Sequence, residues 1–431
     1  MDVVIIFGVL CAIIFLGFIA EIIFKRTNIP DVLILICVGI FLSAGFGVVN
    51  GDTFGEGAKL FTTFALIFIL FQGALSIDFK NLFSSVGKSA MLTIVSFFLT
   101  VLFVTPVAYL IFENILISML VGMILGGTSS AVVIPLVNSL NISEKNKLVL
   151  TLESAISDVL VIVGALTILQ IIQTGSIEAS NIFQTLLTSF SLAIVVGVIL
   201  GTFWIILLHK FDILAKTHVV TIGLVLGLYS FVESPFVDAS GAIAALAFGL
   251  MLGNSKTILS ITTGKNKKRI LVTEDEPESK VIRSVLSNNA KSFYNEISFF
   301  VKIFFFVYLG IMMDFTNLWI FVYGFIISMT IFLVRPYAVL AVYKKDKSLT
   351  DFDRTIMEIM IPKGLAAAVI AGIAVQSGYL GDSATNLVGI VLSVVLISII
   401  ITSITVFLTD KRWFRGFLPF LYNYTKDKEK L

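Results

Sequence analysis

The sequence predicts an all-α membrane protein that crosses the bilayer about thirteen times. Hydrophobic residues make up 58% of the 431-residue chain and charged residues only 13%. The mean hydropathy of +1.04 also lies outside the range of a soluble domain. Apolar runs of about 20 residues, the length that spans a bilayer, recur between short polar breaks along the chain. Lysine and arginine fall almost entirely in alternate breaks, which is the pattern of a polytopic protein.

The expected spans follow one another from the N-terminus, and each is dominated by aliphatic and aromatic residues. They cover residues 3–24, 30–49, 59–77, 89–112, 115–137, 147–172, 182–208, 218–234, 238–254, 294–313, 317–343, 355–377 and 386–408.

The placement of charge predicts the orientation in the membrane. Basic residues follow the odd-numbered spans, with the longest basic stretch in the loop 255–293, whereas acidic residues such as Asp52 and Glu113 follow the even-numbered ones. By the positive-inside rule the N-terminus lies outside and the tail 409–431 is cytoplasmic. We therefore expect a multi-pass protein of the cell membrane.

Composition also argues against several functional classes. The chain carries 30 basic and 28 acidic residues, a balance that does not suit a nucleic-acid partner. Cys11 and Cys37 both fall inside apolar spans, where they act as small hydrophobic residues. No HExxH or GxSxG motif occurs, so we expect neither an enzyme nor a cofactor.

The fifth span is interrupted at its centre by the run GGTSS (126–130), with Pro135 following. Glycine is a poor helix former, serine and threonine compete for backbone hydrogen bonds, and proline removes a donor. Unwound backbone at membrane depth is tolerated only inside protein or along a wet cavity. Its freed carbonyls and the hydroxyls of Thr128 and Ser129 are hard oxygen ligands for an alkali cation. The alternative interpretation is that the small residues simply allow close helix packing.

The twelfth span carries a matching interruption at Pro362–Lys363–Gly364. If the seventh span is a linker, spans 1–6 and 8–13 form two inverted six-helix repeats, and the two interruptions occupy the same position in each. Paired interruptions of this kind predict a transporter binding site.

The sixth span contributes the acidic residues. Asp158 lies about 16 Å along the helix from its cytoplasmic end, at the middle of the bilayer core. Ser154 shares a face with Asp158, and this face is expected to look toward the interruption in the fifth span. Glu153 and Ser157 share a face turned by about 100°. We expect Glu153 to pair with Arg335 of the eleventh span, because an unpaired buried charge is costly.

Seven motifs occur in an order that resembles a known family. They are IPDVLILICVGI, LFQGALSIDFK, GGTSSAVVIP, ESAISD, FFFVYLGIMMDF, VRPYAV and PKGLAAAV. With these motifs nearly the whole chain resembles the monovalent cation/proton antiporter superfamily, in its prokaryotic NhaP and NHE-related sodium/proton exchanger branch. The resemblance implies an NhaA-like fold with crossed discontinuous helices 5 and 12. It also implies a homodimer, with core helices at about 89–172 and 317–408 and dimerisation helices at about 1–77 and 182–313.

The resemblance further implies roles for individual residues. Asp158 matches the acid that binds cation or proton, Ser154 and Thr128 match coordinating groups, and Glu153 with Arg335 matches a structural ion pair. Ser129 and Ser157 complete the expected cation-binding set, and Gln72 and Lys363 are candidates for a role in the pore or its gating.

The chain departs from the family pattern at three positions. It has Ser157–Asp158 where the branch usually has Asn–Asp, Thr128–Ser129–Ser130 in place of Thr–Asp–Pro, and Gln72 in place of a glutamate. With fewer carboxylates, K⁺ or Li⁺ remains an alternative to the expected Na⁺. Ser157 and Arg335 favour electroneutral 1:1 exchange, since the electrogenic branch has two adjacent acids and a lysine.

The sequence therefore predicts a secondary active cation/proton antiporter that works by alternating access in pH and cation homeostasis. The alternative is a Kef-like K⁺ efflux system regulated by a separate subunit. No GxGxxG motif of a nucleotide-binding domain follows residue 408, which disfavours this alternative.

Overall fold

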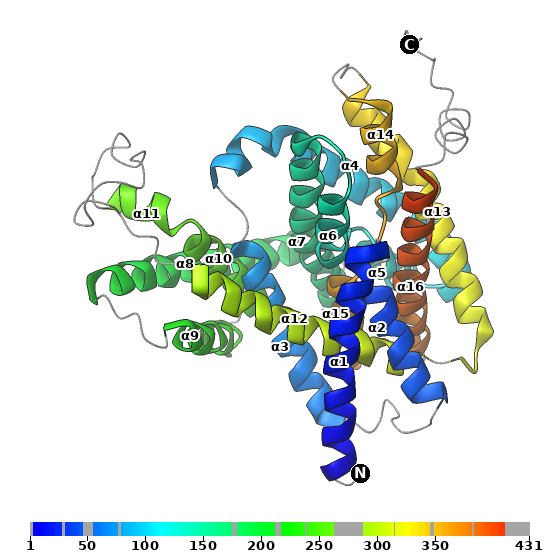
Figure 1. The fold of residues 1–431 in the computed structure, drawn as a ribbon, viewed down its shortest axis with the longest axis horizontal. Helices are drawn as coiled ribbons and strands as arrows, with labels where there is room; N and C mark the ends of the chain where they lie inside the picture. Colours follow the sequence, from blue (N-terminus) through cyan, green and yellow to red (C-terminus); the bar gives the residue numbers. More distant parts are fainter. Residues whose placement is uncertain are drawn as a thin grey trace. The chain divides into compact units, whose positions relative to one another are not determined.

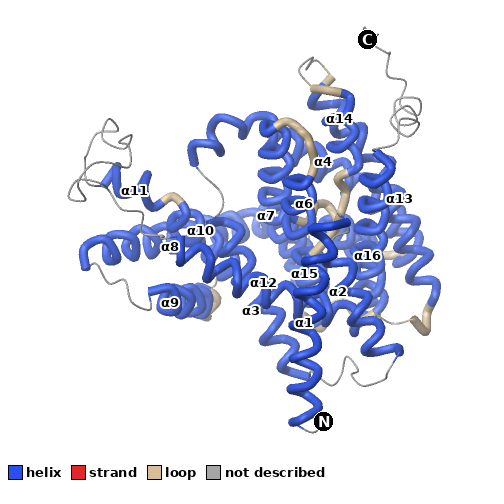
Figure 2. The backbone as a smooth tube through the Cα atoms, viewed as in Figure 1, coloured by secondary structure: helices blue, strands red, loops and turns tan. Residues whose placement is uncertain are grey.

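The computed structural model describes an all-helical chain (Figures 1 and 2). The described residues are 3–27, 31–45, 55–75, 79–174, 179–211, 217–237, 239–262, 288–313, 315–344, 349–381 and 383–409, and no strand occurs among them. The predicted all-α fold is confirmed.

The first half of the chain contains α1 (Val3–Thr27), α2 (Asp31–Ile40) with a π-helix (Phe41–Gly45), α3 (Gly55–Leu75), α4 (Phe79–Phe112), α5 (Ile115–Ile124), α6 (Ser130–Ser139) and α7 (Glu144–Thr174). The second half contains α8 (Ala179–Phe211), α9 (Thr217–Val232), α10 (Gly241–Gly253), α11 (Ser255–Thr262), α12 (Asn288–Ile311), α13 (Leu318–Tyr343), α14 (Asp351–Ile359), α15 (Leu365–Gln376) and α16 (Ser383–Thr409).

These helices correspond to the expected spans. If α5 with α6 and α14 with α15 each form one interrupted segment, and α11 is set aside, the described helices make thirteen segments. Seven of the described helices, α1, α4, α7, α8, α12, α13 and α16, are long and apolar enough to cross a bilayer on their own. The protein is therefore a multi-pass membrane protein.

Two boundaries differ from the prediction. Helix α4 begins at Phe79 rather than at residue 89, because a polar stretch with lysines continues the helix beyond its apolar part. The expected loop 255–293 is helical at both ends, since residues 255–262 form α11 and residues 288–293 belong to α12. Ile258 and Leu259 of α11 are buried, and this packing explains the extra helix. Residues 263–287 of that loop and the tail beyond Thr409 lie outside the described residues.

The chain divides into two compact units. Unit 1 comprises residues 1–56, 85–177 and 303–431, and unit 2 comprises residues 57–84 and 178–302. Unit 2 is built from α3, the first residues of α4, α8–α11 and the first part of α12. Unit 1 contains both interrupted segments together with α7, α13 and α16. The functional division into a core and a dimerisation scaffold stays a prediction.

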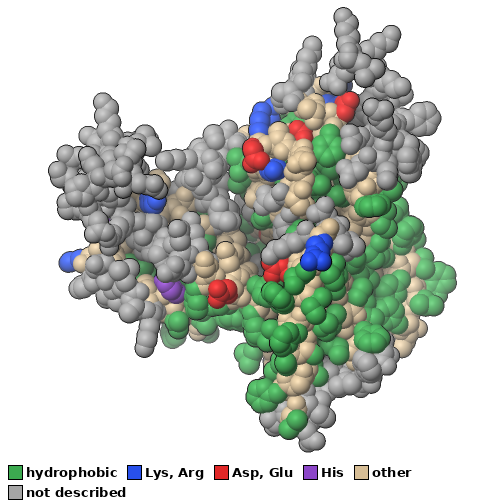
Figure 3. Space-filling model, in the orientation of Figure 1, with side chains coloured by type: hydrophobic (Ala, Val, Ile, Leu, Met, Phe, Trp, Pro, Cys, Tyr) green, Lys and Arg blue, Asp and Glu red, His purple; other side chains and the backbone are tan. Residues whose placement is uncertain are grey.

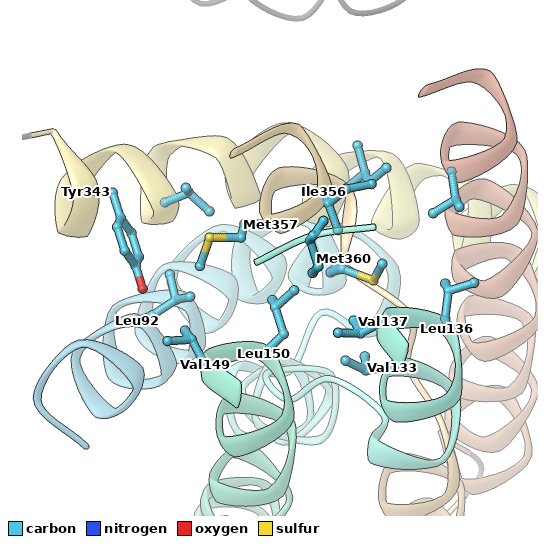
Figure 4. Packing of buried hydrophobic residues seen from close by; sticks show 14 residues of the cluster. Leu92, Val133, Leu136, Val137, Val149, Leu150, Tyr343, Ile356, Met357 and Met360 are labelled. Carbon is cyan, nitrogen blue, oxygen red and sulfur yellow. The ribbon is translucent and has the colours of Figure 1, made fainter. Parts of the chain in front are cut away.

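Within unit 1, the half-helices α6 and α14 are held by a common apolar cluster (Figure 4). Val133 and Val137 of α6 and Met357 of α14 meet Leu92 of α4 and Leu150 of α7, and all five side chains are buried. With ten and nine residues, neither half-helix is long enough to span a membrane. Packing against longer neighbours therefore helps to hold both half-helices in place.

The surface of unit 1 has the distribution expected for a lipid-facing protein. On the face shown in Figure 3, hydrophobic side chains cover α1 and α2, and charged side chains gather near the starts of α7 and α14. Both of these helices begin with charged residues, Glu144 and Lys145 in α7 and Asp351 and Asp353 in α14. Charge at helix ends and apolar side chains between them fit a bilayer.

Candidate functional site

The first interruption separates α5 from α6. Helix α5 ends at Ile124, residues 125–129 leave the helical path, and α6 begins at Ser130. Gly126, Gly127, Thr128 and Ser129 in this stretch are buried. The interruption predicted from the GGTSS run is confirmed.

The second interruption, which is also confirmed, separates α14 from α15. Residues 360–364 are not helical, and α15 begins at Leu365. Lys363 in this stretch is 2% exposed. Its backbone N–H donates to the hydroxyl of Ser398 on α16 at 2.9 Å. The neighbouring helix thus satisfies a donor that the interruption removes from the helix.

The two interruptions meet and satisfy one another's backbone groups. The Ser129 N–H donates to the carbonyl of Pro362 at 2.8 Å. The Lys363 ammonium donates to the carbonyl of Gly127 at 2.6 Å. Gly364 lies directly against the side chain of Ser129, where any Cβ atom would overlap it. We refer to residues 125–130 and 360–365 as the crossing.

The position of Lys363 has an electrostatic reason. Its ammonium lies just beyond the C-terminal end of α5, where the carbonyls of a helix concentrate partial negative charge. A buried ammonium is costly unless such a partner is present. Lys363 therefore holds the crossing together.

Helix α7 lies against the first interruption. The Thr128 N–H donates to Ser157 Oγ at 3.0 Å, and the two hydroxyl oxygens are 3.5 Å apart. Ser157 in turn donates to the carbonyl of Ser154 at 2.9 Å. This approach needs a glycine at position 127, because a Cβ atom there would lie 2.7 Å from the Val161 side chain.

Asp158 lies beside the start of α6. Its Oδ2 accepts a hydrogen bond from Ser130 Oγ at 2.9 Å. Both residues are partly exposed, whereas the neighbouring Thr128 and Ser129 are buried. Since Ser130 is the first residue of α6, the carboxylate also faces the partial positive charge of a helix N-terminus. The arrangement combines a partly buried carboxylate with a neutral hydroxyl at hydrogen-bonding distance.

The structure differs from the predicted faces of the sixth span in one respect. Ser154 donates to the carbonyl of Thr151 within α7 at 3.0 Å, and Ser157 takes the hydrogen bond to Thr128 instead. The reason is that the interruption changes direction beside α7. It contacts Ser157 through Thr128 and Asp158 through Ser130, although these α7 positions are neighbours in sequence.

Glu153 and Arg335 form a buried bidentate ion pair. Arg335 Nη1 donates to Glu153 Oε1, and Nη2 donates to Oε2 at 2.8 Å. The side chains are 2% and 4% exposed. The guanidinium also donates to Ser96 Oγ of α4 and, at 2.9 Å, to the carbonyl of Met357 in α14.

Sequence reasoning missed Ser130 and Ser96. Ser130 lies within the GGTSS run, which indicates an interruption but not a contact with Asp158. Ser96 belongs to a series of buried hydroxyls on one side of α4, formed by Ser89, Thr93, Ser96 and Thr100. Their spacing of three and four residues is a signal for a polar helix face.

The predicted site residues divide between the two units. The crossing and α7 bring together Thr128, Ser129, Ser157, Asp158 and Lys363, with Ser154 next to them. Gln72 lies in unit 2, where its amide donates to Asn295 at 3.1 Å and its carbonyl accepts from Ser298 at 3.4 Å. Gln72 therefore has a polar environment of its own on α3 and α12.

The fold and the site define a class of membrane transporter in which two interrupted helices cross beside a carboxylate. Residues 11–411 match the model of the transmembrane sodium/hydrogen exchanger family. The chain belongs to this family.

Two curated relatives illustrate the similarity. A probable Na⁺/H⁺ antiporter 2 of Methanocaldococcus jannaschii is 26% identical over 388 residues, which cover 86% of this chain and 85% of the relative. The K⁺/H⁺ antiporter NhaP2 of Shewanella oneidensis is 27% identical over 238 residues, or 54% of this chain and 41% of that protein.

A solved structure shares the fold. The sodium proton antiporter MjNhaP1 of Methanocaldococcus jannaschii superimposes with a TM-score of 0.78 at 21% sequence identity. The match covers 96% of this chain and 100% of MjNhaP1. The fold is thus that of an NhaP-like antiporter.

Proposed function

We propose that the protein is a secondary active antiporter that exchanges a monovalent cation for a proton across the cell membrane. Na⁺ is the expected cation, with K⁺ and Li⁺ as alternatives, and the exchange is electroneutral with 1:1 stoichiometry. Membership of the sodium/hydrogen exchanger family supports cation/proton exchange. The similarity to relatives named for Na⁺ and for K⁺ supports both cations as candidates.

The observation that carries the proposal is the contrast between two carboxylates on α7. Both carboxylate oxygens of Glu153 accept hydrogen bonds from Arg335 in a buried pair, so neither oxygen is available to an ion. Asp158 is partly exposed and bonded to the neutral hydroxyl of Ser130. Asp158 is therefore the carboxylate that can exchange its partner for a proton or a cation.

Coupling follows from competition for this single carboxylate. Either a proton or a monovalent cation neutralises Asp158, but both cannot occupy it together. The ionised carboxylate without a cation is costly to enclose away from water. The two neutral forms are therefore the ones that change access from one side of the membrane to the other.

The neighbouring hydroxyls supply the proposed cation shell. Thr128 and Ser157 lie within hydrogen-bonding distance of each other, Ser157 accompanies Asp158 in the sequence of α7, and Ser154 adjoins Ser157. Hydroxyl and carbonyl oxygens are hard ligands that suit alkali cations. Because these ligands are neutral, the complex of Asp158 with one monovalent cation has no net charge, as 1:1 exchange requires.

The remaining features of the proposal concern the whole protein. We expect a homodimer with the N-terminus outside and the C-terminus in the cytoplasm, as the alternation of charge predicts. Exchange of cation for proton in this orientation would serve pH and cation homeostasis.

Purified protein in proteoliposomes tests the proposal. With a proton gradient and a fluorescent pH probe, we expect Na⁺, K⁺ or Li⁺ to collapse the gradient, and Asp158→Asn to abolish this response. Asp351→Asn is the matched control, because Asp351 is exposed at the start of α14. Exchange by Asp158→Asn at the wild-type rate would refute the proposed role of the carboxylate.

The stoichiometry has its own readout. A Na⁺ gradient imposed on liposomes without other permeant ions should leave a potential-sensitive dye unchanged while protons move. A membrane potential that develops with the Na⁺ gradient would rule out electroneutral exchange.

A further inference from the structure

We infer that Ser130 is a direct ligand of the transported cation and sets the affinity of the site. This inference rests on the proposed function, because it concerns the cation that Asp158 binds. Neither the sequence motifs nor the spacing of residues on α7 indicates Ser130 as a ligand.

The contacts at the site single out Ser130 among the hydroxyls. Its Oγ lies 2.9 Å from Asp158 Oδ2. Ser154 is turned toward the carbonyl of Thr151, and Ser129 packs its side chain against Gly364. The hydroxyl of Thr128 adjoins that of Ser157. The hydroxyl that touches the exchanging carboxylate therefore belongs to Ser130.

Ser130 also differs from the other hydroxyl residues of the site in its exposure to solvent. Thr128, Ser129, Ser154 and Ser157 are all buried. Ser130 and Asp158 are both partly exposed, and their side chains are in contact, so an ion bound to the carboxylate oxygen lies next to this hydroxyl.

The distance suits a shared cation. Hard cations of the size of Ca²⁺ bind oxygen at roughly 2.3–2.6 Å, so one such ion can bridge two oxygens about 3 Å apart. In the structure the Ser130 hydroxyl is the donor to Asp158. Rotation about its Cβ–Oγ bond turns the proton away and presents a lone pair, and this requires no change in the backbone. The same side chain can thus bond the ionised carboxylate or coordinate the ion that neutralises it.

The charge of the ligand is also favourable. A second carboxylate at this position would leave the complex with one monovalent cation negative, whereas a hydroxyl leaves it neutral. Ser130 therefore supplies an oxygen ligand that keeps the complex of Asp158 with one monovalent cation neutral.

The test compares three substitutions at Ser130 with a control on the same helix. Ser130→Ala removes the ligand, Ser130→Cys keeps the size but replaces a hard oxygen with soft sulfur, and Ser130→Thr keeps the hydroxyl. The control is Ser139→Ala at the end of α6, where the exposed hydroxyl bonds to the carbonyl of Leu136. Each protein is reconstituted, and the KM and maximal rate are measured for Na⁺, K⁺ and Li⁺ at one pH.

We expect Ser130→Ala and Ser130→Cys to raise the KM for the transported cation about tenfold or more while the maximal rate stays within about twofold. Ser130→Thr and Ser139→Ala should keep the wild-type KM. A purely structural role would lower the maximal rate or the yield of folded protein and would not distinguish threonine from cysteine.

The outcomes separate this inference from the proposed function. If the wild-type protein exchanges a cation and both Ser130→Ala and Ser130→Cys keep its KM, Ser130 is not a ligand. If only Ser130→Ala fails to fold, Ser130→Cys decides the question. A wild-type protein that exchanges none of the three cations would instead contradict the proposed function itself.

Discussion

One guanidinium joins four helices of unit 1. Arg335 of α13 contacts Glu153 of α7, Ser96 of α4 and the backbone of Met357 in α14. All of these groups come from elements that surround the crossing. We therefore propose that the ion pair stabilises the helices around the crossing and does not bind the cation itself.

This role predicts a large and asymmetric effect of mutation. Glu153→Leu or Arg335→Met alone leaves one charge buried without its partner, and we expect a loss of roughly 3–5 kcal/mol in stability. The double variant Glu153→Leu/Arg335→Met removes both charges and should be more stable than either single variant. Thermal unfolding in detergent, followed by tryptophan fluorescence, measures the stability of the two single variants and the double variant relative to the wild-type protein.

A suitable control is an exposed ion pair on the same helix. Lys147 and Glu144 of α7 are 2.9 Å apart, and the Glu144 side chain is 88% exposed. Glu144→Gln should change stability by about 1 kcal/mol at most, as surface ion pairs do. A double variant that is less stable than both single variants would contradict the proposed structural role.

At the level of residues, the sequence predicts those contacts without which a buried group would be left at a high cost in free energy. The pairing of Glu153 with Arg335 could be predicted, since neither charge is tolerated alone in the membrane. The contacts of Ser157 and Ser130 could not be predicted. Helical periodicity tells which residues share a face of α7, but it does not tell how the interrupted segment α5–α6 runs past that face. A hydroxyl can also be satisfied by its own helix, as Ser154 is, so its direction is weakly constrained.

Among the elements, the crossing depends on the absence of a side chain at one position. Gly364 allows the second interruption to lie against Ser129, and a Cβ atom would overlap the Ser129 side chain. The hydrogen bonds Ser129–Pro362 and Lys363–Gly127 both need this approach. A change at Gly364 should therefore separate the two interruptions.

We predict that Gly364→Ala strongly lowers exchange and the melting temperature, because the added methyl group displaces Ser129. Gly372→Ala is the matched control in the middle of α15, since a Cβ atom there meets no atom within 4 Å. This second alanine should be neutral or slightly stabilising, because alanine favours a helix more than glycine does. Equal behaviour of the two variants would show that the tight approach at Gly364 is unimportant.

The elements themselves differ in how well the sequence predicts them. Apolar runs predict the thirteen segments that the described helices make when the two interrupted pairs are joined and α11 is set aside, and glycine, serine and proline predict both interruptions. The start of α4 and the short helix α11 were not predicted, since both lie in polar sequence where composition does not separate helix from loop. Burial of Ile258 and Leu259 stabilises α11, and a sequence does not show which residues these two side chains will contact.

For the molecule as a whole, the alternation of charge predicts which turns face the cytoplasm. Ser143 lies in the exposed turn before α7, after the fifth span, and should be cytoplasmic. Ser234 lies in the turn after α9, the eighth span, and should face outward. In a chain with Cys11 and Cys37 replaced by alanine, a membrane-impermeant maleimide should label Ser234→Cys in intact cells and Ser143→Cys only in inverted vesicles.

Both substitutions exchange oxygen for sulfur in a turn, so the two variants are matched in size and chemistry. Detergent-solubilised samples, in which both sides are accessible, should label equally and provide the reference. Labelling of Ser143→Cys in intact cells would reverse the proposed orientation.

The hydrogen bond between Lys363 and Gly127 joins residues 236 positions apart in the chain. During synthesis the fifth segment must therefore enter the membrane long before its counterpart exists. Until then its freed backbone groups need temporary partners, such as water or the insertion machinery. The proposed transport site is consequently among the last parts of the protein to be assembled. A chain truncated ahead of α14 would be inserted and largely helical, yet it would display unsatisfied polar backbone that cellular quality control can recognise.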